Sequence, residues 1–184
     1  MDSGKQTLFV MGGSQGARSI NDAVVDLISR ASLPGNWQIV HLCGSGDYER
    51  IIRAYERSDL ARSNVVLPFL ADPADAYACA EVALTRAGAG TLAELAAVGL
   101  PAILVPYPHA SEDHQRINAQ RFEGAGAALI IDDAELDAGS LMRALQAIFD
   151  PTTLERMRRA TRALSNPQAL ERILERVRAL TGAV

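Results

Sequence analysis

Short runs of apolar residues alternate with longer stretches of helical periodicity over the first three quarters of the chain, and each run ends in glycine, proline or small polar residues. The runs are continuous rather than alternating in polarity, which is typical of strands in a parallel sheet covered on both faces. The predicted strands are Thr7–Met11, Gln38–Leu42, Val65–Leu67, Val82–Thr85, Ala102–Val105 and Ala128–Ile131. The predicted helices are Ser19–Arg30, Asp47–Arg57, Pro73–Cys79, Thr91–Val98, Asp113–Glu123 and Ser140–Phe149. This order predicts an α/β fold with a doubly wound parallel sheet of about six strands.

The pattern changes after Asp150-Pro151, where two helices follow each other without a strand between them. Asn166-Pro167 separates the two helices, because proline fits the first turn of the second one. We therefore expect one domain, with its sheet in residues 7–149 and a helical tail in residues 151–180. A chain of 184 residues has no room for a second full domain.

Composition excludes several classes of function. The formal net charge of -4 and the pI near 5.4 argue against a nucleic-acid-binding protein. No apolar stretch approaches the length of a membrane span, and the N-terminus lacks the layout of a signal peptide. Basic residues cluster only near the C-terminus, at Arg156, Arg158, Arg159 and Arg162. This cluster is either a solvated helix face or a docking surface.

Two cysteines, Cys43 and Cys79, lie in apolar sequence surroundings without C-x-x-C spacing. They indicate neither a disulfide framework nor a zinc site, so a reduced, cytoplasmic setting is expected.

The first predicted strand runs into a glycine-rich turn that opens a helix, Gly12–Arg18, with the sequence G-G-S-Q-G-A-R. Glycines let backbone N–H groups approach an anion closely, and a helix N-terminus adds partial positive charge. The turn fits phosphate binding, but it equally fits a tight connection that packs helix against strand. The spacing of a P-loop is absent.

A second glycine-rich turn follows the fourth predicted strand and reads R-A-G-A-G-T-L-A-E from Arg86. Thr91 and Glu94 have the spacing of a capping box, while a carboxylate at this sheet edge is also suited to accept hydrogen bonds from both hydroxyls of a ribose. Gly88 and Gly90 fit the G-x-G-x-x-A form of the dinucleotide fingerprint. The turn is in the fourth βα unit, however, and no acidic residue closes the next strand, which argues against NAD.

A third polar loop follows the fifth predicted strand and ends in D-H-Q-R-I-N-A from Asp113, a candidate N-cap. His114, Gln115 and Asn118 share roughly one face of the first turn, where they would either read sugar hydroxyls or face solvent. No H-x-x-x-H, H-E-x-x-H or D-x-D spacing occurs, so no metal site is predicted. Any diphosphate would be neutralised by helix termini and backbone donors instead.

Four elements together closely resemble the C-terminal domain of the MurG family, within glycosyltransferase family 28: G-G-S-Q-G-A-R at 12–18, R-x-G-x-G-T-x-x-E at 86–94, G-L-P-A at 99–102 and D-H-Q-x-x-N-A at 113–119. The resemblance implies half of a GT-B fold, in which two Rossmann-like domains face each other across a cleft. It identifies this chain as the domain that binds the donor, UDP-N-acetylglucosamine (UDP-GlcNAc). The family uses that donor, by inverting transfer, to convert lipid I to lipid II in peptidoglycan biosynthesis.

The resemblance also assigns roles to individual residues. It places Glu94 at the ribose, the backbone of Phe69 and Leu70 at uracil, and His114 and Gln115 at the GlcNAc hydroxyls. The first family position of that last pair is glutamine, where this chain has His. The two glycine-rich turns surround the diphosphate and sugar. The expected substrate-binding residues are Gly13, Ser14, Gln15, Phe69, Leu70, Arg86, Gly88, Gly90, Thr91, Glu94, His114, Gln115 and Asn118.

The family's N-terminal domain, which binds lipid I, contributes to membrane association and is expected to supply the catalytic base, has no counterpart in this sequence. The chain starts directly before its first strand, as expected of an excised domain or a separately encoded subunit. The resemblance therefore implies donor binding without useful turnover and a parent enzyme that is peripheral on the cytoplasmic face of the inner membrane. The alternative is a non-catalytic donor-binding subunit of a split glycosyltransferase that works with a membrane partner.

Overall fold

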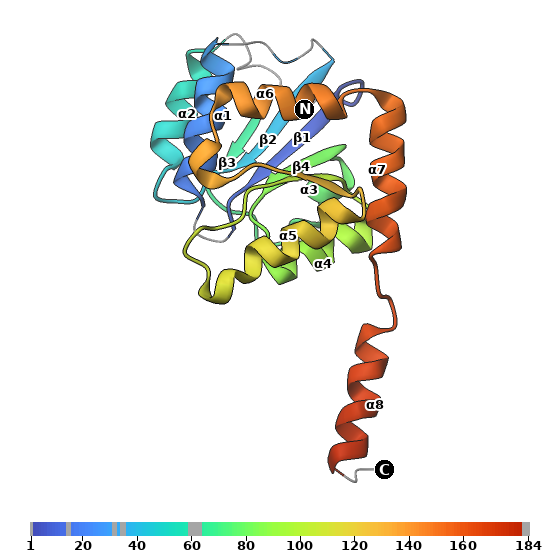
Figure 1. Cartoon of the computed structure of the whole chain (residues 1–184). Helices are drawn as coiled ribbons and strands as arrows, with labels where there is room; N and C mark the ends of the chain where they lie inside the picture. The colour runs from blue at the N-terminus through green and yellow to red at the C-terminus, as the bar shows by residue number, and fades with distance from the viewer. Residues whose placement is uncertain (1, 14–15, 31–32, 34–35, 59–63, 182–184) are drawn as a thin grey trace.

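The computed structural model describes residues 2–13, 16–30, 33, 36–58 and 64–181, which form a six-stranded, all-parallel sheet flanked by helices (Figure 1). The strands are β1 (Gln6–Met11), β2 (Trp37–Leu42), β3 (Val65–Leu67), β4 (Val82–Thr85), β5 (Ala102–Leu104) and β6 (Ala128–Ile130). The predicted α/β fold with about six parallel strands is confirmed, and every strand end lies within one residue of its prediction.

The α-helices are α1 (Arg18–Arg30), α2 (Tyr48–Glu56), α3 (Ala74–Ala78), α4 (Ala89–Val98), α5 (His114–Gly124), α6 (Ala138–Ile148), α7 (Pro151–Ala163) and α8 (Ala169–Thr181). Helices α1, α2 and α6 cover one face of the sheet, and α3, α4 and α5 cover the other (Figure 1). Short 3-10 turns precede α5 and α6, at η1 (Ser111–Asp113) and η2 (Asp133–Glu135).

The strand order is β3-β2-β1-β4-β5-β6. From β1 the chain adds β2 and β3 toward one edge of the sheet and then returns to add β4, β5 and β6 toward the other edge, so the switch point lies between β1 and β4. These two strands are hydrogen-bonded neighbours that end together, with Met11 opposite Thr85. Ligands of open α/β sheets bind at such a switch point, beyond the carboxyl ends of the strands. Both glycine-rich turns begin there.

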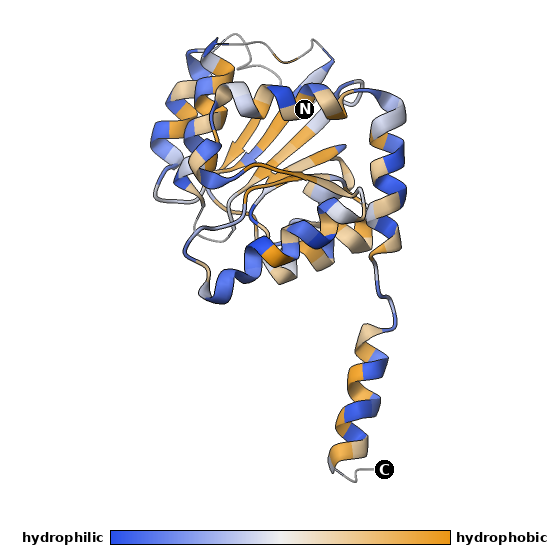
Figure 2. Cartoon of the chain, viewed as in Figure 1, coloured by the Kyte–Doolittle hydropathy of each residue, from blue (hydrophilic) through white to orange (hydrophobic). Residues whose placement is uncertain are grey.

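Alternate residues of β1 enter opposite layers of the core, because successive strand side chains point to opposite faces. Leu8 and Val10 pack under α1 and α6, whereas Phe9 and Met11 pack under α3 and α4. The strands are almost uniformly apolar in Figure 2, as a sheet buried on both sides requires. Burial on both faces holds the sheet rigidly, and the sheet in turn positions the loops at the switch point.

The interior contains a polar cluster around His41, which the apolar pattern of the second predicted strand did not predict. His41 is fully buried, and its Nδ1 and Nε2 lie 3.2 Å from the Tyr55 hydroxyl and 3.0 Å from Asn21 Oδ1. The amide nitrogen of Asn21 donates to the Cys43 carbonyl at 2.9 Å and to Asp47 at 2.8 Å. The cluster therefore ties α1 and α2 to the end of β2, directly beside the first glycine-rich turn.

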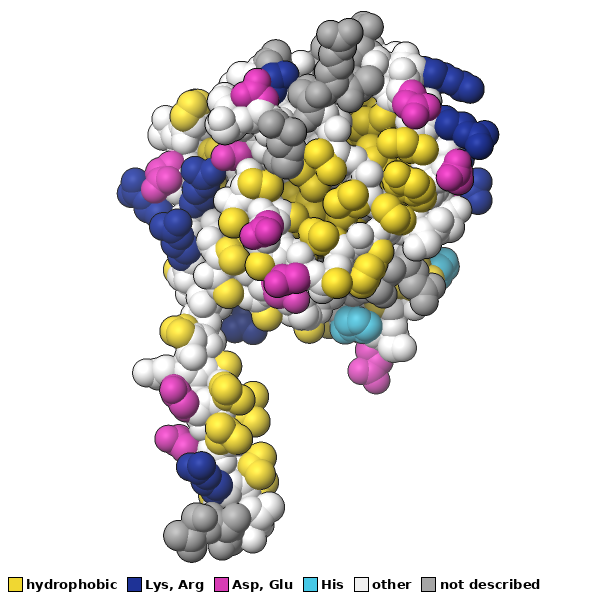
Figure 3. All heavy atoms as spheres, turned by 180° about the vertical axis from the view of Figure 1, so that it is seen from behind, with side chains coloured by type: hydrophobic (Ala, Val, Ile, Leu, Met, Phe, Trp, Pro, Cys, Tyr) yellow, Lys and Arg dark blue, Asp and Glu magenta, His cyan; other side chains and the backbone are white. Residues whose placement is uncertain are grey.

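The helical tail divides into two unlike parts. Asp150 caps α7 by accepting from the Thr153 N–H at 2.7 Å, and Leu154 and Met157 join the core. Helix α8 extends away from the sheet and buries none of its side chains (Figure 1). Its apolar residues form an exposed stripe, visible in Figures 2 and 3, at Leu170, Ile173, Leu174, Val177 and Leu180. Within the described ranges, no helix has the length and apolar character needed to cross a membrane.

Two surface details differ from a simple reading of the sequence. Cys79 is exposed, although its sequence neighbours are apolar, because α3 is short and ends at the surface. The basic cluster is only partly solvated: Arg158 lies 3.9 Å from Glu81, and the side chain of Arg162 lies against Gly99. Part of this cluster thus packs the tail onto the domain.

Candidate functional site

The first glycine-rich turn uses its glycines in two ways. A Cβ atom at Gly12 would lie 2.1 Å from the Ala17 nitrogen, and one at Gly16 would lie 2.3 Å from the Cys43 carbonyl oxygen. These two glycines serve tight packing. Gly13 has a φ of +90°, but a Cβ there would meet nothing within 4 Å. Ser14 and Gln15 lie outside the described residues, so their predicted roles stay predictions.

The second glycine-rich turn leads directly into α4, and of the two interpretations of Thr91 and Glu94 the capping box is wrong. The helix begins at Ala89 with Gly88 as its N-cap, which puts Thr91 inside the first turn, and no side chain caps it. Leu92 makes the first backbone bond, to the Gly88 carbonyl at 3.0 Å. The N–H groups of residues 89–91 therefore have no acceptor within the helix and carry the positive end of its dipole.

Gly88 and Gly90 border open space rather than packed atoms. A Cβ at Gly88 would meet only the Thr91 hydroxyl, at 3.9 Å, and a Cβ at Gly90 would meet nothing within 4 Å. The free protein thus has no packing reason for glycine at either position. Their lack of a side chain leaves the start of α4 accessible to a ligand.

A cavity of about 550 Å³ lies between the two turns, at the N-termini of α1 and α4. Helix α1 begins without a charged N-cap at Ala17, and its rim residue Arg18 is 81% exposed. The cavity is lined by Gly12, Gly13, Gly16, Ala17, Arg18, Ser19, Arg86, Gly88, Thr91, Tyr107, Pro108, His109, Gln115 and Asp133. Two helix N-termini and Arg18 give it the character of an anion site, whereas the charge of Arg86 is paired with that of Asp133.

Arg86 braces the loops around this cavity. Its guanidinium donates to Asp133 at 2.6 Å, to the Ser19 hydroxyl at 2.9 Å and to the Val105 carbonyl at 3.1 Å. Partial burial opposes ionisation of Asp133, but hydrogen bonds from Ser19 and Arg86 and the charge of Arg86 outweigh it, so the pKa of Asp133 is lowered. Because protein groups occupy several Arg86 donors, its predicted contact with substrate stays a prediction.

The polar residues of α5 do not act as one set. Gln115 lines the cavity, and its Oε1 accepts from the Ala87 N–H at 3.2 Å and the Tyr107 N–H at 3.0 Å. This leaves the amide NH₂ of Gln115 as its available donor. Asn118 lies behind it and donates to the Ala87 carbonyl at 3.3 Å.

His114 is exposed, does not line the cavity, and pairs through Nδ1 with the Ser111 carbonyl at 2.7 Å. Asp113 takes the N-cap position of α5, as predicted, but its side chain makes no cap hydrogen bond. Asp113 and Glu112 have left-handed φ angles of 54° and 52°, so the entry to α5 is locally strained.

A smaller cavity of about 280 Å³ adjoins the first on the side of β2 and β3. Its lining is largely apolar and includes Phe69, which is 58% exposed, and Leu70. Its carboxylate is Glu94, whose Oε2 accepts from the Tyr77 hydroxyl at 2.6 Å. An apolar pocket with one acceptor suits a flat base attached to a group that carries hydroxyls.

The two cavities share Gly13 and Thr91, so they form one elongated cleft across the switch point. The sequence-predicted residues Gly13, Arg86, Gly88, Thr91 and Gln115 line the large cavity. Phe69, Leu70 and Glu94 line the small one. One end of the cleft is apolar with a carboxylate, and the other is polar with helix N-termini.

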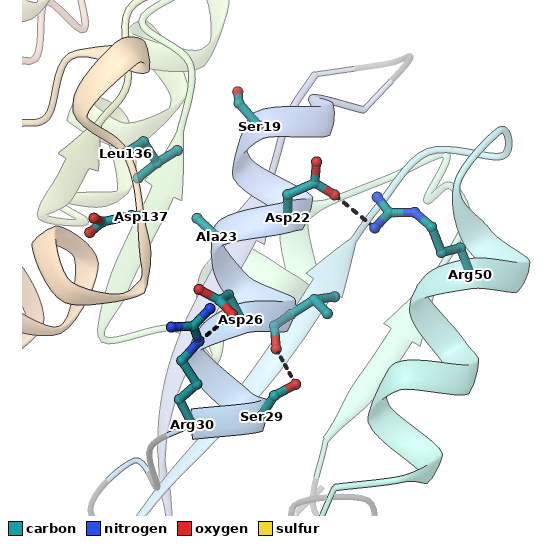
Figure 4. Close-up of a pocket in the computed structure, with 10 residues that line it drawn as sticks. Ser19, Asp22, Ala23, Asp26, Ser29, Arg30, Arg50, Leu136 and Asp137 are labelled. Carbon is teal, nitrogen blue, oxygen red and sulfur yellow. Dashed lines mark hydrogen bonds and ion pairs between the residues drawn. The ribbon is translucent and has the colours of Figure 1, made fainter.

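A third hollow, of about 530 Å³, lies along the outer side of α1 (Figure 4). Four of its charged side chains form ion pairs, Asp22 with Arg50 at 2.7 Å and Asp26 with Arg30 at 2.6 Å (Figure 4), and Asp137 accepts from the Ser140 N–H at 2.7 Å. Among the residues that the structure describes, no three His, Cys, Asp or Glu side chains gather as a metal site would require. Metal-free binding nevertheless stays a prediction.

Several residues that line the cleft were not predicted from the sequence, among them Ser19, Tyr77, Tyr107, His109 and Asp133. Tyr107, His109 and Asp133 follow strands β5 and β6, so their position after a strand was a usable signal. Ser19 and Tyr77 lie within helices, where the sequence contains no sign that they face a cleft.

The chain matches the model of the glycosyltransferase family 28 C-terminal domain over residues 7–173. A UDP-N-acetylglucosamine--N-acetylmuramyl-(pentapeptide) pyrophosphoryl-undecaprenol N-acetylglucosamine transferase from Syntrophotalea carbinolica is 45% identical over 77% of this chain and 39% of its own length. The enzyme of the same name from Halothermothrix orenii is 38% identical over 84% of this chain and 43% of its own length. The chain thus spans about two fifths of the curated relatives it matches.

Solved structures agree with this placement. Acinetobacter baumannii MurG superposes with a TM-score of 0.85 at 29% identity, covering 95% of this chain and 52% of that protein. S. aureus MnaA, solved with UDP, has a TM-score of 0.70 over 98% of this chain and 47% of its own; at 14% identity it shows the shared fold alone. The fold, the family model and the relatives agree, and the chain belongs to glycosyltransferase family 28 as a MurG-like C-terminal domain.

Proposed function

We propose that this domain binds UDP-GlcNAc along the elongated cleft and is the donor half of an N-acetylglucosaminyltransferase. Uracil and ribose occupy the small cavity beside Phe69, Leu70 and Glu94, and the diphosphate and GlcNAc occupy the large one. The relatives of the chain are named for transfer of N-acetylglucosamine to an undecaprenol-linked acceptor. The acceptor, lipid I, and the catalytic base belong in this proposal to a second, membrane-associated half on the cytoplasmic face.

The observation that carries the proposal is the junction of the two cavities at the uncapped start of α4. A nucleoside diphosphate sugar has a flat base with apolar faces, a ribose rich in hydroxyls and a doubly anionic middle. The cleft offers an apolar pocket, a carboxylate and free helix N–H groups in the same order. A diphosphate at Gly13 and Thr91 would sit where both cavities meet.

The same N–H groups have a role in the reaction. When an acceptor hydroxyl attacks the anomeric carbon, the bond to the diphosphate breaks and negative charge grows on the departing UDP. Fixed donors at the N-terminus of α4 stabilise that charge without a metal ion, since they are already oriented. The NH₂ group of Gln115 is placed to donate to a sugar hydroxyl, because its carbonyl oxygen is held by two backbone N–H groups.

Calorimetric titration of the domain with UDP-GlcNAc, UDP and NAD, each with and without EDTA, tests the proposal. We expect that EDTA does not change the affinity for UDP or the affinity for UDP-GlcNAc. NAD should bind weakly or not at all. Loss of UDP binding in EDTA would contradict the metal-free site. Tighter binding of NAD than of UDP would contradict the nucleotide-sugar assignment.

A further inference from the structure

Tyr77 of helix α3 has a buried ring, but its hydroxyl lies at the cleft. It is only 6% exposed, and its ring packs edge-on against Phe9 with centroids 5.4 Å apart. Its hydroxyl reaches past the core to the cleft, where it donates to Glu94 Oε2 at 2.6 Å and lies 3.6 Å from the Met11 sulfur. A buried ring therefore presents one polar atom at the wall of the small cavity.

That hydroxyl is a fixed donor. Burial, followed by the hydrogen bond to Glu94 and its charge, raises the pKa of Tyr77 well above that of a free tyrosine. The hydroxyl group is therefore a donor, and the Glu94 carboxyl group is the acceptor beside it. The ring cannot swing away, because Phe9 packs against it.

Glu94 depends on this bond for its orientation. The side chain is exposed on α4, and the capping role that would have explained it is excluded, because the N-cap is Gly88. Tyr77 is its one hydrogen-bond partner among the described residues. A glutamate side chain has several rotatable bonds, and fixing them costs rotamer freedom.

We propose that Tyr77 is a positioning residue that holds Glu94 ready to accept hydrogen bonds from the vicinal hydroxyls of the donor's ribose. The inference rests on the proposed function, which assigns the ribose to Glu94. Tyr77 takes up one lone pair of Oε2 and leaves Oε1 and the remaining lone pair of Oε2 available to a ligand in the cavity that both residues line.

The test is Tyr77→Phe, which deletes the hydroxyl and keeps the packed ring. Tyr55→Phe is the matched control, because Tyr55 is also buried, at 3%, its hydroxyl pairs with His41, and neither of these two residues lines the cleft. Each variant is titrated with UDP and with 2′,3′-dideoxy-UDP, which lacks both ribose hydroxyls. Melting temperatures report whether each variant is folded.

We expect Tyr77→Phe to weaken UDP about five- to tenfold and to leave dideoxy-UDP nearly unchanged, since only the ribose contact depends on Glu94. Tyr55→Phe should alter neither affinity. In a Glu94→Ala background, Tyr77→Phe should add no further loss, because the two residues act as one unit.

The outcomes separate the two levels of the argument. If wild type and Glu94→Ala prefer UDP over dideoxy-UDP equally, Glu94 does not read the ribose and that part of the proposed function fails. If Glu94→Ala loses the preference but Tyr77→Phe keeps it, the positioning role alone is overturned. Equal losses for both ligands in Tyr77→Phe would also overturn it, as a general structural effect.

Discussion

Gly88→Ala separates a glycine needed by the fold from a glycine needed by the ligand. Gly88 has φ −67° and ψ 143°, an extended conformation open to any residue, and a Cβ would meet only the Thr91 hydroxyl at 3.9 Å. Replacing a glycine N-cap by alanine costs about 0.5–1 kcal/mol of stability. Restricting the unfolded chain returns about 0.4–1 kcal/mol, so the free energy of unfolding should change little.

Donor binding should change much more. Gly88 lines the large cavity at the start of α4, where the diphosphate must approach the backbone to reach the free N–H groups. A methyl group fixed on the backbone cannot move aside, and overpacking of this kind costs about 1–3 kcal/mol. That corresponds to an affinity for UDP and UDP-GlcNAc reduced about five- to 150-fold.

The assay pairs calorimetric titration with denaturant unfolding of the same preparations. Gly124→Ala is the control: Gly124 ends α5 outside the cleft, and a Cβ there would also meet nothing within 4 Å. It should leave affinity unchanged. Unaltered UDP affinity in Gly88→Ala would show that the diphosphate does not approach the start of α4. A stability loss well above 1 kcal/mol would instead show that the free protein itself needs this glycine.

Two further predictions concern Gln115 and His41. Gln115→Glu keeps the acceptor for the Ala87 and Tyr107 N–H groups but removes the NH₂ donor. In parallel titrations, the affinity for UDP-GlcNAc should therefore fall about fivefold or more beyond any change in the affinity for UDP. Equal changes for both ligands would refute this placement of the sugar. Burial lowers the pKa of His41 from 6.5 to about 3, so the unfolded chain takes up the proton first as the pH falls below 6.5. The free energy of unfolding should therefore fall by about 2 kcal/mol between pH 7 and pH 5 through this residue. In urea unfolding, the free energy of unfolding of His41→Gln should fall less over the same pH range, by that amount. An unchanged pH dependence would contradict a neutral, buried His41.

Much of the fold was predictable from the sequence, because parallel strands buried on both faces must be continuously apolar and their helices must be amphipathic. Val65–Leu67 and Val82–Thr85 have the same limits in the prediction and in the structure. Asp150-Pro151 correctly marked the start of α7, since a capping carboxylate followed by proline has few other uses. Helix ends were predicted less well. The helix predicted to begin at Thr91 begins at Ala89, and because Gly88 is its N-cap, the capping-box spacing of Thr91 and Glu94 is not used.

The sequence by itself determined which loops border the cleft, because βα units place the turns after the strands along one edge of the sheet. Only the tertiary structure decided what each residue of those loops does. Gly12 and Gly16 serve packing while Gly13, Gly88 and Gly90 border open space, a distinction that depends on atoms far along the chain. Arg86 is tied to Asp133, 47 residues away, and Glu94 to Tyr77 of another helix. Pairings of this kind arise from the order in which strands assemble in the sheet, which local sequence patterns do not encode.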